Sequence, residues 1–102
     1  MKVFGYNLEQ FEWDSHNEEK NRLKHNALPY ECEEIFFSNI FIAEDALHSQ
    51  TEHRFVALGR TDAGRYLFIA FTVRGINIRV ISARDMNRKE KEVYDEKTNG
   101  NI

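Results

Sequence analysis

The chain has 102 residues, of which 41% are hydrophobic and 13% aromatic, and this length and composition fit one compact domain spanning residues 1–102. Its single cysteine, Cys32, excludes a disulfide framework and a multi-cysteine zinc site, which favours a reducing, cytoplasmic location. No stretch is apolar enough for a secretory signal or a transmembrane helix, so we expect no membrane association.

Charge is divided unevenly along the chain. Taken alone, the formal net charge of −3 argues against a nucleic-acid partner, because phosphate binding usually needs an excess of Lys and Arg. Four basic and eleven acidic residues precede Arg54, whereas ten basic and six acidic residues lie from Arg54 onward. This asymmetry indicates an anionic partner for the second half and a basic one for the first, with chance segregation on a solvated surface as the alternative.

The first predicted elements are a short strand and a polar helix. The segment FEWD at 11–14 alternates apolar and acidic residues, as a half-buried strand does. Asp14 or Ser15 then caps a helix that ends near His25, and Ser15 and Glu18 have the spacing of a capping box. This helix has almost no apolar stripe, which predicts a surface position.

A second helix is predicted to begin at Pro29 and to run to about Phe37, because proline suits the first helical turn. Its apolar residues have a spacing that allows them to be buried together: Tyr30, Cys32, Ile35 and Phe36. Phe36, Phe37 and Phe41 are also candidates for a partner contact, although one hydrophobic core could absorb all three.

From residue 40 the pattern is that of strands. Asp62 and Gly64 supply one hairpin turn, and Gly75 supplies another. Four runs rich in Ile, Val, Phe and Tyr are therefore predicted to form an antiparallel meander: residues 40–44, 53–60, 65–73 and 76–83. The third run is apolar on both faces, which indicates a central strand covered on both sides.

A third helix, at 88–94, is predicted from the capping-box spacing of Asn87 and Glu90, and the tail from Lys97 is expected to fray. The fold class is therefore α+β. We expect an antiparallel meander of four to five strands, preceded by two helices and followed by one, with the helices covering one face of the sheet.

Strand alternation places the arginines. In the second run of the meander one side of the strand carries Arg54, Val56, Leu58 and Arg60, and in the fourth run one side carries Asn77, Arg79, Ile81 and Ala83. Alternation does not determine the register between strands, so the relative position of these arginines is open at this point. We predict that Arg60, Arg79 and Arg84 converge.

A series of short motifs runs from residue 11 to residue 94. In chain order they are FEWD, N..KH at 21–25, ED..HS at 44–49, E.R...LGR at 52–60, GR.L...FT.RG at 64–75 and IR.ISAR at 78–84. In this order and at this spacing, the motifs resemble those of the BrnT ribonuclease toxins.

The resemblance implies a RelE-like fold and the toxin component of a type II toxin–antitoxin system. It further implies an endoribonuclease that cleaves mRNA and inhibits translation, and a BrnA-like antitoxin of the ribbon-helix-helix type through which the pair binds operator DNA. Three positions depart from the family pattern: Asn17, Asn26 and Ala46. Asn26 replaces a glycine, and asparagine tolerates the left-handed conformation that often ends a helix.

RNA cleavage without a metal needs a base, an acid and cations, because the ribose 2′-hydroxyl itself attacks the phosphorus. Arginine suits the cationic role, since its planar fork pairs with two phosphate oxygens. Together with the resemblance, this assigns phosphate binding and catalysis to Arg60, Arg79 and Arg84, and further RNA contacts to Lys24 and Arg54.

Each of these arginines also has an ordinary structural interpretation. Arg79 could pair with a carboxylate on an exposed sheet face. Arg84, where a strand gives way to a helix, could bind backbone carbonyls or an acidic neighbour such as Asp85. Arg60 and Arg65 flank a hairpin, where a structural or antitoxin-binding role is as reasonable as an RNA contact, and Arg65 is not assigned to the site.

Two histidines are candidates for moving protons. His48 lies in a loop between strands, where an imidazole that titrates near neutrality is free to serve a site. His25 is the second candidate, although a cation is also favoured there by the C-terminus of the helix. Glu52 could act as a base or pair with Arg54, and this alternative stays open.

No metal ligand motif such as HExxH is present, so we expect no metal and no other cofactor. A second function from a different class is compatible with the same residues. The chain could be a non-catalytic binding module that docks an acidic protein partner through its basic sheet face.

Overall fold

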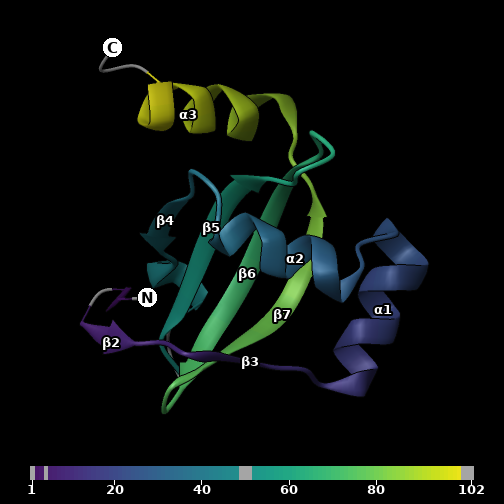
Figure 1. Ribbon diagram of the computed structural model, residues 1–102, viewed down its shortest axis with the longest axis vertical. Helices are drawn as coiled ribbons and strands as arrows, with labels where there is room; N and C mark the ends of the chain where they lie inside the picture. Colours follow the sequence, from purple (N-terminus) through teal and green to yellow (C-terminus); the bar gives the residue numbers. More distant parts are fainter. Residues whose placement is uncertain (1, 4, 49–51, 100–102) are drawn as a thin grey trace.

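A five-stranded sheet forms the centre of the protein (Figure 1). The structure, a computed structural model, describes residues 2–3, 5–48 and 52–99. Strand order in the sheet is β3-β7-β6-β5-β4, and the strands span Gln10–Glu12 (β3), Phe41–Glu44 (β4), Arg54–Arg60 (β5), Tyr66–Arg74 (β6) and Asn77–Asp85 (β7). β4 to β7 pair antiparallel in chain order, which confirms the predicted meander.

The fifth strand differs from the expectation of an antiparallel sheet. β3 runs parallel to β7, with Glu12 opposite Arg79. A parallel neighbour requires a long connection between the two strands, and here the helices and the rest of the meander provide it. A separate two-stranded sheet, β1 (Lys2–Val3) and β2 (Tyr6–Asn7), precedes β3 and was not predicted from the sequence.

Helix α1 spans Ser15–His25 and is capped by Asp14. The Asp14 carboxylate accepts hydrogen bonds from the backbone N–H groups of His16 and Asn17, so Ser15 is the first helical residue and the alternative cap at Ser15 is wrong. The helix ends at Asn26, whose φ of 51° is left-handed. Asparagine thus supplies the conformation that glycine supplies in the family pattern.

Helix α2 spans Pro29–Phe36 and packs against β5 and β6. Cys32, Ile35 and Phe36 are buried as predicted, but Tyr30 is 60% exposed, so its predicted burial is wrong. Tyr30 lies on the outer side of a helix only two turns long, where one stripe alone reaches the sheet. Phe37, just beyond the helix, is 82% exposed.

Helix α3 spans Arg88–Asn99, longer than the predicted 88–94. The capping box is formed: Glu90 N–H donates to Asn87 Oδ1, and Asn87 N–H donates to Glu90 Oε1. Residues 100–102 of the predicted frayed tail lie outside the described residues. Within the described ranges no helix has both the length and the apolar character needed to cross a membrane.

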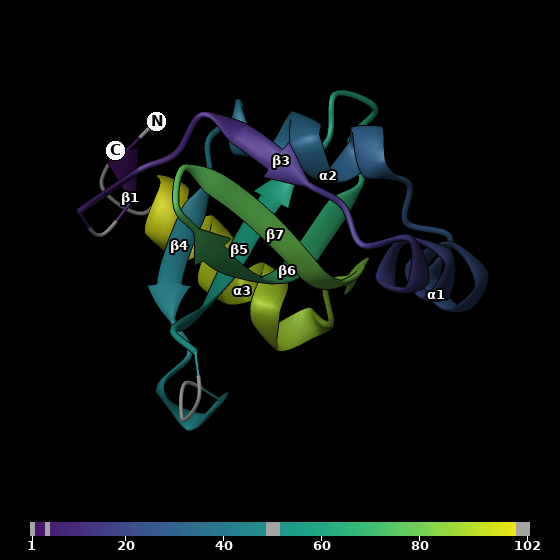
Figure 2. The same cartoon turned by 90° about the horizontal axis from the view of Figure 1, so that it is seen from below.

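The helices do not all cover one sheet face, which corrects the sequence-based expectation. α2 packs on the face that carries Phe55, Leu67 and Phe71, whereas α3 lies on the opposite face (Figure 2). The second face carries Leu58 and Phe68, whose apolar surface α3 covers at one end of the sheet. The central strand β6 is therefore apolar on both faces, as predicted.

An irregularity in β7 determines which of its residues share a face. Ala70 of β6 pairs with Ser82, but Phe71 pairs with Val80, so Ile81 is an extra residue in β7. Such a β-bulge reverses the alternation beyond it. Val80 and Ala83 accordingly both have 0% exposure and face the core, and Arg79 and Arg84 both face the other side.

Candidate nucleic-acid interface

The register brings four of the predicted arginines to one face of the sheet. Residues directly opposite each other in paired strands point to the same side, and the pairs here are Arg60↔Tyr66, Phe68↔Arg84, Arg54↔Thr72 and Thr72↔Arg79. We call this side the arginine face. It is the side on which α3 lies, opposite the core packed by α2. Simple alternation had placed Arg79 with the buried Ala83, and the bulge at Ile81 corrects that placement.

Arg54, Thr72, Arg79 and Glu12 lie in one line across four strands, and we call them the arginine row. Arg79 donates to Asp14 Oδ2 at 2.6 Å. The pKa of Asp14 is lowered, mainly by the hydrogen bonds from His16 and Asn17 and further by Arg79. Arg79 is therefore held at the surface of the sheet by the residue that also caps α1.

His48 lies beside the other end of the arginine row. Asp45 follows β4, and its backbone N–H donates to the Arg54 carbonyl at 2.8 Å, which extends the β4–β5 pairing by one residue. His48 Nδ1 lies 2.9 Å from Asp45 Oδ2, and the imidazole is 59% exposed. The short helical turn Ala46–His48, which follows β4, lies on the side of the sheet opposite α2 (Figure 2). A carboxylate that orients an exposed imidazole is a common arrangement for proton transfer.

Two buried polar atoms belong to the β3–β7 edge near Arg79. Glu12 Oε2 and Asn77 Oδ1 have no hydrogen-bond partner within the described residues. Glu12 is opposite Arg79, and Asn77 precedes it by two residues on the same strand. Sequence reasoning did not select Glu12 or Asp45, because their nearness to the arginines depends on strand pairing.

Arg84 lies in a different line of the same face. Its two terminal nitrogens each donate to a Glu90 carboxylate oxygen at 2.8 Å, and its guanidinium lies 4.0 Å above the Phe68 ring. The pKa of Glu90 is lowered, first by hydrogen bonds from Arg84 and then by the Asn87 N–H. The pKa of Arg84 is raised by the same pair. Arg84 therefore makes the contacts of its structural interpretation. It binds an acidic residue, Glu90, and a backbone carbonyl, that of Asp85.

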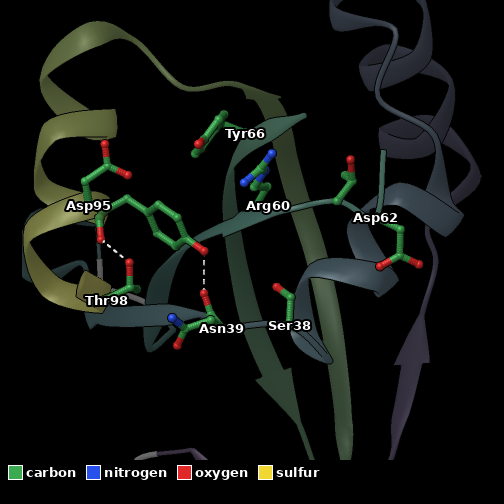
Figure 3. Close-up of a pocket in the computed structure, with 9 residues that line it drawn as sticks. Ser38, Asn39, Arg60, Asp62, Tyr66, Asp95 and Thr98 are labelled. Atoms are coloured by element: carbon green, nitrogen blue, oxygen red, sulfur yellow. Dashed lines mark hydrogen bonds between the residues drawn. The ribbon is translucent and has the colours of Figure 1, made fainter. Parts of the chain in front are cut away.

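Arg60 lines a cavity of about 380 Å³ between the end of β5 and α3 (Figure 3). Its guanidinium lies 5.3 Å from the Tyr66 ring centroid. Tyr94 forms part of the opposite wall, and burial raises the pKa of its phenol, which donates to the Asn39 carbonyl at 2.6 Å. The predicted convergence of Arg60, Arg79 and Arg84 is therefore wrong in detail. They share a face, but Arg79 and Arg84 have separate carboxylate partners and Arg60 lies in this cavity.

Arg65 connects several elements through its hydrogen bonds. It donates to Asp85 and Glu31 and to the backbone carbonyls of His25 and Asn26. These contacts connect the end of β7, the start of α2 and the end of α1, all on the core side of the sheet. His25 thus lies away from the arginine face, and so the structure does not bring it together with Arg79.

Lys24 is exposed on α1, apart from the arginine row. Glu52 Oε1 lies 3.5 Å from Arg54 Nη2. Of the two roles considered for Glu52, a base or an ion pair with Arg54, the structure contains the ion pair. Among the residues the structure describes, no group of three or more His, Cys, Asp or Glu side chains is placed to hold a metal ion.

Comparison with known proteins identifies the family. A family model described as ribonuclease toxin, BrnT, of type II toxin–antitoxin system matches residues 13–90. The crystal structure of the Brucella abortus ribonuclease toxin BrnT is similar in fold, with a TM-score of 0.56 and 20% identity over 78% of this chain and 97% of that one. No curated protein sequence matches. Because the family model covers most of the chain, including every arginine of the arginine face, the protein belongs to the BrnT family of ribonuclease toxins.

Proposed function

We propose that the chain is a metal-independent endoribonuclease that cuts mRNA and inhibits translation, with the scissile phosphate bound across the arginine row. Membership of the family implies an RNA target and an antitoxin partner. The observation that supports the site is the register, which lines up Arg54 and Arg79 on either side of Thr72. Two strand spacings separate them by about 10 Å, a span that admits one phosphodiester between two guanidinium groups.

His48 is the proton acceptor in this proposal. The neutral imidazole takes the proton of the 2′-hydroxyl, whose oxygen then attacks the phosphorus while the bond from phosphorus to the 5′-oxygen breaks. The products are a 2′,3′-cyclic phosphate and a 5′-hydroxyl, which receives its proton from water at the open sheet surface. Asp45, 2.9 Å from Nδ1, orients the ring so that Nε2 is free to act. Arg54 and Arg79 stabilise the negative charge that develops on the phosphorane oxygens.

The ion pairs on the arginine face are compatible with RNA binding. The side chains of Arg79 and Asp14 are 20% and 33% exposed, and partly exposed pairs contribute little net stability. A phosphate also presents two charged oxygens. It can therefore replace Asp14 as the partner of Arg79, or bind Arg79 together with Asp14. Arg84 lies about 13 Å along the strand from Arg79, so it contacts a different phosphate of the same RNA.

The antitoxin in this proposal is BrnA-like, of the ribbon-helix-helix type, and operator DNA is bound only through it. The acidic first half of the chain suits a basic partner segment. We further propose that residues 1–102 act as one toxin domain in the cytoplasm. Lys24 contributes an RNA contact at the periphery. Of the two histidine candidates, His48 and His25, the proposal keeps only His48 for proton transfer.

The test is cleavage of an mRNA by the purified chain and by Arg79→Ala. We expect the variant to lose about 100-fold in rate, as when one transition-state donor is removed. Arg22→Ala is the matched control, because Arg22 is an exposed arginine on α1, outside the arginine face. Thermal unfolding monitors the fold of both variants, and a chelator should leave the rate unchanged.

Equal rates for Arg79→Ala and Arg22→Ala would remove the arginine row as the site. Cleavage that stops with chelator would overturn the metal-independent mechanism. A wild-type chain that binds an acidic protein but cuts no RNA would instead favour the non-catalytic binding module.

A further inference from the structure

The cations of the arginine face differ in whether they have an acidic partner. Arg79 and Arg84 pair with Asp14 and Glu90 at 2.6 and 2.8 Å. Arg60 and Lys91, by contrast, make no ion pair with any residue in the described parts of the chain. Their charge is therefore not neutralised by direct contact.

Arg60 and Lys91 meet at one aromatic ring. The Arg60 guanidinium carbon is 5.3 Å and the Lys91 Nζ is 4.4 Å from the centroid of Tyr66. Each cation is attracted to the ring, and this contact does not neutralise its charge. An anion bound beside this ring would be attracted by both charges.

The end of the Arg60 side chain lies next to the hairpin that follows β5. The hairpin between β5 and β6 turns at Gly64, whose φ is 92°, and a side chain added there would lie 3.2 Å from an Arg60 terminal nitrogen. Glycine therefore leaves the space that the guanidinium occupies. The turn is closed by hydrogen bonds from Gly64 N–H to the Thr61 carbonyl and from Thr61 N–H to the Arg65 carbonyl.

The opposite wall of the cavity presents hydrogen-bond acceptors. Tyr94 donates its hydroxyl hydrogen to the Asn39 carbonyl, Thr98 donates to the Tyr94 carbonyl (Figure 3), and Ser38 donates to the Ile35 carbonyl. Each hydroxyl has only one hydrogen, so these oxygens can offer a ligand only their lone pairs. The exposed carboxylates of Asp62 and Asp95 also line the cavity as acceptors. The cavity thus has a cationic side and an acceptor side.

We propose that this cavity is a ribonucleotide subsite, in which Arg60 binds a phosphate and the acceptor wall receives ribose hydroxyl donors. Lys91 does not line the cavity, but it lies over the same Tyr66 ring and adds a second positive charge beside the phosphate. The inference rests on the proposed function and deepens it, because it places a flanking nucleotide of the same RNA here. Tyr66 and Phe68 alternate along the same face of β6, so the subsite is continuous with Arg84 above Phe68. Arg60 then binds substrate away from the scissile bond, and Lys91 is an RNA contact that sequence analysis missed.

Adenosine 5′-monophosphate is a suitable probe, because it contains no internucleotide bond to be cut. It is titrated into the isotope-labelled wild-type chain, and amide chemical shifts are followed. We expect shifts at Thr61, Gly64 and Tyr66, and weaker binding, about threefold, for the 2′-deoxy analogue because it lacks one donor. Lys91→Ala and Arg60→Ala should each weaken binding at these amides about fivefold or more.

Lys97→Ala is the matched control, because Lys97 lies on the same helix and over a different ring, that of Phe41 at 5.9 Å. It should change the affinity less than twofold. In RNA cleavage, Lys91→Ala should raise KM and leave kcat unchanged, as expected for a contact made equally in ground and transition states. Lys91 is exposed, so its removal leaves the fold intact and keeps the test valid even if Arg60→Ala disturbs the hairpin.

Absence of shifts at Thr61 and Gly64, or equal affinities of Lys91→Ala and Lys97→Ala, would overturn the subsite. So would a Lys91→Ala variant that loses antitoxin binding but keeps its KM for RNA. Shifts confined to Thr72 and Arg79 would leave the arginine row intact while removing the subsite. Shifts at Thr61 and Gly64 would support the subsite, whereas the arginine row is tested by the cleavage rate of Arg79→Ala, so the two proposals fail separately.

Discussion

The two faces of the same sheet use aromatic residues in opposite ways. On the core face, Phe11, Phe36, Phe71 and Phe55 form a chain of rings in which neighbouring centroids are 5.3 Å apart. On the arginine face, Tyr66 and Phe68 instead support cations, with Arg60, Lys91 and Arg84 positioned over them. Alternate residues of one strand therefore serve two purposes. The first face stabilises the fold, and the second holds charged groups at an accessible surface.

The faces also differ in how tightly they are packed. On the core face α2 packs directly on β5 at Gly59. A Cβ added at this position would lie 2.7 Å from the Ile35 Cβ, so the close packing requires glycine. On the arginine face the corresponding space between strands and helix is a cavity. This difference predicts that substitutions on the two faces separate stability from RNA binding.

The largest expected effect is that of Phe71→Ala on the core face. Phe71 has 0% exposure and contacts two other rings, so its truncation leaves a cavity and should lower the free energy of unfolding by about 3–5 kcal/mol. Urea unfolding measures the loss, and RNA affinity per folded molecule should stay unchanged. A change in that affinity would show that the faces are not independent.

A smaller effect is expected from Asp14→Asn, which addresses the Arg79 pair. Asparagine keeps the oxygen that caps α1 but no longer carries the negative charge that holds Arg79. We expect an RNA oligonucleotide with 2′-O-methyl groups, which cannot be cut, to bind about threefold more tightly. Fluorescence anisotropy measures this, with Glu19→Gln as control for a lost negative charge on α1. A loss of affinity would mean that Asp14 orients Arg79 for RNA rather than competing with it.

The smallest expected effect on stability is that of Glu90→Gln. Glutamine preserves the capping box but removes the charge paired with Arg84, and the partly exposed pair should be worth about 0.5–1 kcal/mol. The pKa of Glu90 is lowered in the folded chain. The charge of Glu90 therefore contributes its full stabilisation above the ordinary glutamate pKa of 4.5, and this stabilisation is lost as pH falls through the pKa of the folded state.

Urea unfolding at neutral and at acid pH checks this sign. The stability difference between wild type and Glu90→Gln should be largest near neutrality and should vanish at low pH. A difference that persists in acid would mean that the charge of Glu90 is not the source of the stability difference.

Much of the fold follows from local patterns. Pro29 and the capping residues predict where helices begin, Asn26 predicts where α1 ends, and the turns at Gly64 and Gly75 predict the meander. These signals are strong because each depends on residues within a few positions of one another. The buried positions Cys32, Ile35 and Phe36 were likewise predicted from spacing.

The site was predicted less completely. His48 and the arginines were selected by residue type and by resemblance, whereas Asp45, Glu12 and Lys91, which lie near them in the structure, were not selected. Their relevance depends on contacts between residues far apart in the chain, such as Lys91 with Tyr66. Alternation also misassigned Arg79, because one extra residue in β7 reverses the side on which every following residue lies.

The sequence by itself therefore determined the three helices, the four strands of the meander, their order along the chain and the family to which the chain belongs. Only the tertiary structure decided that β3 pairs parallel with β7, that α3 covers the arginine face, and that Arg79 and Arg84 share it. It also decided which cations have acidic partners and which do not. The physical reason is that local propensity acts along the chain, whereas register, bulges and ion pairing depend on groups brought together only when the chain folds.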